Sequence, residues 1–208
     1  MSLHLVTPPA VLPVTLSELK LQLGFGPMED TDQLREQIVA EQIRPAITAA
    51  TDQCEAICAR AFITQTWRMT LDGFPRWHER YEIEHRNDIT IPLPTFQTLD
   101  AFTYIDPTGT VQDVMAAGGW GYQLVSGGDR QTARLRPKVA EPWPFTLVEQ
   151  ADAVAITFTC GFGDTPGAVP YAVRAAVKLC AEWIYNGSKG IQPPAIAALL
   201  SPYVIDIV

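Results

Sequence analysis

The stretch 153–185, AVAITFTCGFGDTPGAVPYAVRAAVKLCAEWIY, contains two different hydrophobic periods in succession. Up to Cys160 the pattern alternates, so that Val154, Ile156 and Phe158 share one face of a predicted strand with Cys160. From Pro170 onwards apolar residues recur at spacings of three and four, which predicts a helix that ends at Asn186-Gly187. This stretch alone predicts a chain that joins β-structure directly to helix.

Residues 15–62, towards the N-terminus, have the helical period. Thr15 and Glu18 form an S/T-x-x-E capping box that predicts a short helix, which ends at the breaker 24–27. Asp30 and Gln33 can cap a second, longer helix, and Pro45 is predicted to kink or split it. At the other end of the chain, Pro193-Pro194 predicts a last short helix that stops at Ser201-Pro202.

The region 63–163 alternates with a period of two. Short predicted strands are separated by Pro and Gly turn signals, of which 106–109 (DPTG) is the strongest. We therefore predict an α+β fold in which the N- and C-terminal segments form a helical bundle and an inserted antiparallel β-domain is a sandwich or a small barrel. The predicted parts are 1–62 (N-terminal helical), 63–168 (inserted β-domain) and 169–208 (C-terminal helical part and tail, packed with 1–62).

The charge balance argues against nucleic-acid binding in a groove and against membrane insertion. The 208 residues carry 15 basic and 23 acidic side chains, a net charge of −8, and no segment has a basic cluster. No apolar run approaches the ~18 residues of a membrane span, and the proline-interrupted N-terminus is not a signal peptide. We expect synthesis in the cytoplasm and no membrane partner.

Motifs for chemistry are few. Cys54 and Cys58 lie one helical turn apart, but nothing completes a metal site, so they are interpreted as buried thiols. His78 and His85 lie in a mixed-charge stretch interpreted as solvated, and Asp30-Thr31-Asp32 is interpreted as helix capping. We predict no catalytic, cofactor-binding or metal-binding residue, no cofactor, and no enzymatic activity.

The aromatic residues of the β-region leave two interpretations open. They form either a sugar-stacking surface or part of a core or protein interface. These residues are Trp67, Phe74, Trp77, Trp120 and Trp143. A carbohydrate-binding or other accessory module of a tail or baseplate is therefore the alternative function.

Nine short motifs, in this order, resemble one protein family: TLSELK (15–20), AFITQTW (61–67), LDGFP (71–75), IPLP (91–94), YIDPTG (104–109), WP (143–144), VAITFTCGFG (154–163), VPYAVRAA (169–176) and LLSPY (199–203). Together they resemble the head–tail connector (adaptor) proteins of tailed bacteriophages and gene transfer agents. The stretch Arg76–Asp88 looks like an elaboration of the first β-hairpin of that family.

The resemblance implies a structural protein of the virion neck. It implies a ring of about twelve copies below the portal protein. The ring would join the portal to a stopper, head-closure or tail-completion protein, and genomic double-stranded DNA would pass through its channel without specific binding. The family carries no catalytic residues. We expect the helices to form the ring and the β-domain to project from it.

The last residues of the sequence are the candidate portal contact. After Ser201-Pro202, five of six residues are apolar or aromatic: Tyr203, Val204, Ile205, Ile207 and Val208. Their β-branched side chains favour an extended segment. Such a segment either packs on its own subunit or binds a neighbouring protein by strand addition or groove insertion.

Overall fold

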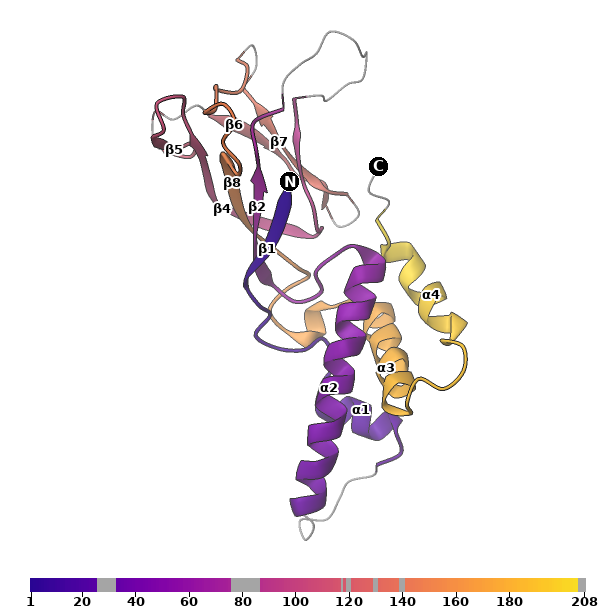
Figure 1. The fold of residues 1–208 in the computed structure, drawn as a ribbon. Coiled ribbons are helices and arrows are strands. Elements are labelled where there is room, and N and C mark those ends of the chain that lie inside the picture. Colours follow the sequence, from indigo (N-terminus) through magenta and orange to yellow (C-terminus); the bar gives the residue numbers. More distant parts are fainter. Residues whose placement is uncertain are drawn as a thin grey trace. The chain divides into compact units, whose positions relative to one another are not determined.

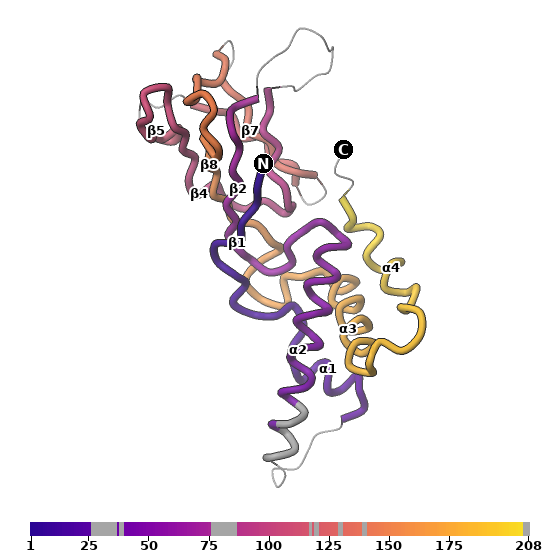
Figure 2. The backbone as a smooth tube through the Cα atoms, in the orientation of Figure 1, coloured from indigo at the N-terminus to yellow at the C-terminus, as the bar shows by residue number. Residues whose placement is uncertain are grey.

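The chain divides into two compact units in the computed structural model (Figures 1 and 2). The model describes residues 1–25, 33–75, 87–116, 118, 121–128, 131–138 and 141–205, without the side chains of 33–36, 38 and 39. Unit 1 comprises Met1–Pro8 and Thr64–Gly161, and unit 2 comprises Pro9–Ile63 and Phe162–Val208. The predicted domain bounds, 1–62, 63–168 and 169–208, stay a prediction. The two compact units begin and end at somewhat different residues.

Unit 1 contains an antiparallel sheet of five strands in the order β1-β2-β8-β4-β5. The strands are β1 (Ser2–Thr7), β2 (Gln65–Leu71), β8 (Val154–Cys160), β4 (Phe96–Ile105) and β5 (Val111–Asp113). In the central register Met69 pairs with Ile156, which pairs with Phe102, and all three side chains are fully buried. The face predicted from the period of two in 153–160 is thus the core face of the sheet.

A second antiparallel sheet in unit 1 has three strands in the order β3-β7-β6. These strands are β3 (Ile89–Ile91), β7 (Ala133–Pro137) and β6 (Tyr122–Val125). Phe102 of β4 and Tyr122 of β6 meet edge to face, with ring centroids 5.8 Å apart. The structure confirms antiparallel β-structure within an α+β chain. The small-barrel alternative is wrong, because no pairing among the described strands closes either sheet.

The N-terminal strand β1 was not foreseen, since the sequence analysis leaves residues 2–7 in the N-terminal helical part. Leu3 pairs with Met69 and Leu5 with Trp67, so β1 extends the apolar face of the five-stranded sheet at its edge. The proline pair that follows the strand, Pro8-Pro9, marks the passage into unit 2. Short edge strands of this kind depend on tertiary pairing, which local periodicity does not report.

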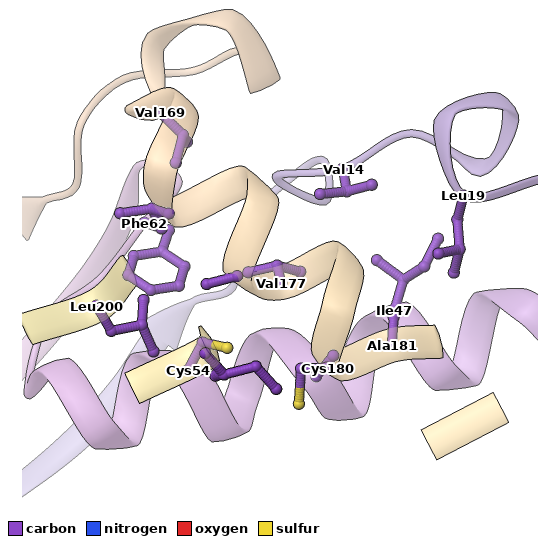
Figure 3. Packing of buried hydrophobic residues seen from close by; sticks show 14 of the residues in the cluster. Val14, Leu19, Ile47, Cys54, Phe62, Val169, Val177, Cys180, Ala181 and Leu200 are labelled. Carbon is purple, nitrogen blue, oxygen red and sulfur yellow. The ribbon is translucent and has the colours of Figure 1, made fainter. Parts of the chain in front are cut away.

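Unit 2 is built from four α-helices that share one apolar core. They are α1 (Leu16–Gln22), α2 (Gln33–Cys58), α3 (Tyr171–Tyr185) and α4 (Pro194–Leu200), with short 3-10 turns at η2 (Pro166–Ala168) and η3 (Ser201–Tyr203). Figure 3 shows side chains of α2 and α3 meeting along their length, with Phe62 and Leu200 at one end of the contact and Leu19 and Ile47 at the other. Residues of the N- and C-terminal segments share this core, and the arrangement of the helices as a bundle stays a prediction.

Helix α2 is continuous through Pro45, so the predicted division of this helix is wrong. Pro45 and Glu41, whose carbonyl lies one turn earlier, are both exposed. Water can therefore satisfy the carbonyl that loses its intrahelical partner. The buried side of the same region carries Ile43, Ala46 and Ile47, whose packing holds the helix together.

Among the described residues, no helix is both long and apolar enough to cross a bilayer.

Candidate interaction surfaces

The described part of the chain contains no cluster of three His, Cys, Asp or Glu side chains that could hold a metal ion. The four cysteines are buried and form no disulfide. Burial raises the pKa of Cys58 to about 11, and a hydrogen bond with Cys180 together with burial raises the pKa of Cys54. The thiols of Cys54 and Cys58 therefore stay protonated at neutral pH and act as core side chains. His78, His85 and Asp30-Thr31-Asp32 lie outside the described residues.

Two of the aromatic side chains that the sequence analysis names in unit 1, Phe74 and Trp143, pack in a core. Phe74 and Trp143 stack in parallel with ring centroids 5.0 Å apart, and both are more than nine-tenths buried. The Trp143 indole N–H donates to the carbonyl of Asn87 at 2.6 Å. Trp67 is half-buried, and Trp77 and Trp120 lie outside the described residues. Two of the five aromatic residues, Phe74 and Trp143, are thus part of a core, and the carbohydrate-binding alternative stays a prediction.

The start of the candidate portal contact is attached to its own unit. Arg60, which is fully buried, donates from Nε to the carbonyl of Tyr203 at 3.0 Å. The Tyr203 ring meets Phe162 edge to face at 6.3 Å, and the guanidinium of Arg60 lies over the Phe162 ring at 5.3 Å. Tyr203 therefore acts as a structural residue of unit 2.

The first residues after Tyr203 lie beside the C-terminal end of α2. The Ile205 N–H donates to the carbonyl of Cys58, the last residue of α2, at 3.3 Å. Val204 is 40% exposed, and Ile205 is half-buried. Ile207 and Val208 lie outside the described residues. We call Val204–Val208 the tail from here on.

A hollow of about 390 Å³ lies in unit 2, and we call it the N-terminal groove. It is lined by most of the stretch Pro9–Leu16, by Arg44 and Ile47 of α2, and by Pro166 of η2. Val14 and Ile47 are almost fully buried, while Val11 is 40% exposed. The lining is therefore largely apolar and partly open to solvent. No local sequence pattern predicts this groove, because its walls come from three separate segments.

The capping box positions one wall of this groove. Thr15 accepts from the Glu18 N–H at 3.3 Å, and Glu18 accepts from the Thr15 N–H at 2.9 Å, as predicted. Glu18 also forms an ion pair with Arg174 of α3, which fixes α1 against α3. Although burial opposes the shift, the bonds to Thr15 and the charges of Arg174 and Lys178 lower the pKa of Glu18. The carboxylate therefore stays charged and keeps the groove wall in place.

Arg44 gives the groove a positive charge. It is exposed, and among the residues that the structure describes it forms no ion pair. It is also the one charged side chain among the described residues that line the groove. An apolar surface with an unneutralised cation is suited to a partner that carries apolar side chains and a carboxylate.

Three solved structures contain chains that are similar to this protein over 100% of its length and 97% of theirs. One belongs to the virion of a native gene transfer agent (GTA) particle, with 26% sequence identity and a TM-score of 0.69. Another belongs to the neck of an empty GTA particle computed with C6 symmetry, with 23% identity and a TM-score of 0.75. The third belongs to the neck of a native GTA particle computed with C12 symmetry, with 24% identity and a TM-score of 0.66.

The likeness covers both units, so the whole α+β arrangement is shared with these chains. No protein-family model matches the sequence, and no curated protein matches it.

Proposed function

We propose that this protein is a structural component of the neck of a gene transfer agent or of a related phage-like particle. The observation that carries the proposal is the full-length likeness to chains of GTA necks and virions. A structural role also agrees with the use of the four thiols and of the Phe74 and Trp143 rings in core packing. The protein's location is then the virion, at the junction of head and tail.

In this role the protein forms a ring. The necks that contain similar chains were computed with C6 and C12 symmetry, which favours a cyclic assembly of about twelve copies. The exposed face of α2 from 41 to 57 is a candidate contact between copies, because three of its nine exposed residues are alanine or proline and allow close approach. These nine are Glu41, Gln42, Arg44, Pro45, Thr48, Ala49, Asp52, Ala56 and Ile57.

Within the neck we assign the protein the adaptor position. The ring would bind the portal protein on one side and a stopper or tail-completion protein on the other, as the resemblance of the nine motifs implies. Genomic DNA would pass through the ring without specific binding. A net charge of −8 supports this passage, because a channel without clustered cations does not retain the phosphate backbone.

The tail stays a candidate contact to another chain. The contacts of Tyr203 with Arg60 and Phe162 assign this residue to the subunit's own core. The predicted intermolecular segment is therefore reduced to Val204, Ile205, Ile207 and Val208 together with Asp206. That this segment contacts the portal protein stays a prediction.

Labelling of intact particles tests the proposal. A copy of the chain with an epitope tag at its N-terminus is produced in cells that make the particles, and gold-conjugated antibody is added after the particles have been gently opened. We expect label at a single vertex, between head and tail. Label spread over the capsid shell, or none in purified particles, would contradict a neck location.

A further inference from the structure

The first turn of α3 displays an aromatic ring between two cations. Tyr171 is 76% exposed, and the charged groups of Arg174 and Lys178 lie over its ring, 5.8 and 5.7 Å from the centroid. Arg174 is paired with Glu18, whereas Lys178 forms no ion pair with any other residue that the structure describes. An exposed tyrosine whose ring is held by neighbouring side chains is a typical anchor of a protein interface.

The exposed face of α2 offers a surface of opposite charge. Six exposed residues recur there at spacings of three and four, on the side of the helix opposite to the buried Ile43, Ile47 and Cys54. The charges among these six are two carboxylates, and the residues between the carboxylates have small side chains that leave room for a ring. We call this set the α2 stripe: Glu41, Pro45, Thr48, Ala49, Asp52 and Ala56.

Within one copy, Tyr171 and the α2 stripe face away from each other. Figure 3 shows Cys54 on the buried side of α2 beside Val177 and Cys180 of α3, so the α2 stripe lies on the far side of α2 from α3. The side of α3 that carries Val177 and Cys180 is buried, and Tyr171 lies on its opposite, exposed side. Only a different copy can therefore bring Tyr171 to the α2 stripe.

We infer that Tyr171 of one copy packs on Ala49 of the neighbouring copy, with Lys178 paired to Asp52. This inference rests on the proposed function, because it assigns a contact that holds the ring together. Asp52 lies one helical turn after Ala49, so a cation held beside the Tyr171 ring comes within reach of its carboxylate. Arg44, the exposed cation of the same helix, lies two turns before Asp52 and lines the groove instead.

The symmetry of the proposed assembly agrees with such a contact. Its two sides are different patches of one chain, so the contact is heterologous and propagates from copy to copy until a ring closes. The necks that contain similar chains were computed with the cyclic symmetries C6 and C12, which a contact of this type produces.

Photo-cross-linking between two isotopically distinct copies tests the inference directly. The photoreactive amino acid p-benzoyl-phenylalanine replaces Tyr171 in protein of natural isotope composition, which is mixed with wild-type protein labelled with heavy nitrogen. After ring assembly and illumination, mass spectrometry should find cross-links from this side chain to the α2 stripe, and they should join light to heavy chains. The matched control carries the same amino acid at Ile191, which is 95% exposed in unit 2, and should give no cross-link to the stripe.

Charge reversal measures the ion pair without a photoreactive group. Asp52→Lys and Lys178→Glu should each raise the protein concentration for half-maximal ring formation, alone or on purified portal protein, at least tenfold. The double variant should restore it to within threefold. Glu41→Lys is the matched control and should change it by less than threefold, because Glu41 lies roughly 16 Å from Asp52 along the helix, beyond the Debye length of about 8 Å.

The thermal unfolding midpoint of each subunit distinguishes loss of assembly from loss of folding. Asp52 is exposed, so Asp52→Lys should leave this midpoint unchanged. Should Lys178→Glu lower it by repelling Glu18, the comparison of Asp52→Lys with Glu41→Lys still decides the outcome.

The outcomes separate this inference from the proposed function. Rings that form normally, show no cross-link to the α2 stripe and ignore the charge reversal at Asp52 overturn the inference and leave the ring intact. Cross-links from position 171 to the portal protein, or to the stripe of the same copy, overturn it too. If the wild-type chain forms no ring either alone or with portal, both proposals fail.

Discussion

At the scale of single residues, Arg60 is a buried cation that links two segments of unit 2 that are far apart in the sequence. The Arg60 side chain is fully buried. It donates a hydrogen bond to the carbonyl of Tyr203, near the C-terminal end of the sequence, and its guanidinium lies over the ring of Phe162. A buried cation in this position connects the end of α2 to the residues that precede the tail. Its function is therefore to fix the point from which the tail leaves.

Replacing Arg60 by alanine should destabilise unit 2. The lost charged hydrogen bond contributes about 1.5–3 kcal/mol and the contact with the Phe162 ring about 0.5–2 kcal/mol. We expect Arg60→Ala to lower the free energy of unfolding by about 2–5 kcal/mol in urea titrations. Arg44→Ala, which replaces an exposed arginine of α2, should change it by less than about 0.5 kcal/mol. Equal effects of the two substitutions would contradict this assignment.

The turn after β4 predicts a pH dependence. Asp106 accepts hydrogen bonds from Thr108, Thr110 and Gln112, which lower its pKa to about 2 from an ordinary value of 3.8. Because the folded state favours the carboxylate, this stabilisation is complete above the ordinary pKa and is lost as the pH falls towards 2. The urea midpoint of the wild type should fall more between pH 4 and pH 2 than that of Asp106→Asn.

A direct measurement accompanies that comparison. The carboxyl carbon resonance of Asp106, followed by NMR as the pH is lowered, should titrate near 2 and not near 3.8. A midpoint close to the ordinary value would show that the turn does not hold the carboxylate, and the pH dependence should then be the same in both proteins.

At the scale of elements, the features that the sequence predicts are those coded by neighbouring residues. The capping box of Thr15 and Glu18, the strand Val154–Cys160 and the turn at Asp106 each depend on residues within a few positions of one another, and all three are present. The strand β1 and the N-terminal groove depend on contacts between distant segments. No local pattern reports such contacts, so neither could be predicted.

Helix α2 shows how packing outweighs a local rule. Relative to alanine, proline in a helix interior lowers the free energy of unfolding by about 3 kcal/mol. Because proline also restricts the unfolded chain, up to about 1 kcal/mol of this loss is offset. Pro45→Ala should therefore raise the free energy of unfolding by about 2 kcal/mol, measured by urea denaturation. The matched variant Ala49→Pro, one turn further along the exposed face, should lower it by about 3 kcal/mol. No gain from Pro45→Ala would mean that the proline relieves a strain that the helix otherwise carries.

At the scale of the whole molecule, the two units support one structural function. Unit 1 has a core of aromatic and aliphatic side chains between two open sheets, and unit 2 has a helical core with a groove on its surface. Their shared likeness to GTA neck chains extends over the entire sequence. The proposed function depends on assembly, so its tests concern the surfaces that would meet other chains.

The central claim, that this chain assembles as a ring in the neck, is tested most directly by measuring the mass of the complex that it forms with purified portal protein. Native mass spectrometry should show portal rings that gain about twelve copies of a 22.9 kDa chain in one cooperative step. Removing Asp206–Val208 should weaken attachment to the portal while the subunit stays folded, because the hydrogen bond between Arg60 and Tyr203 remains in place. A portal that gains no mass, or single chains bound independently of one another, would contradict the account.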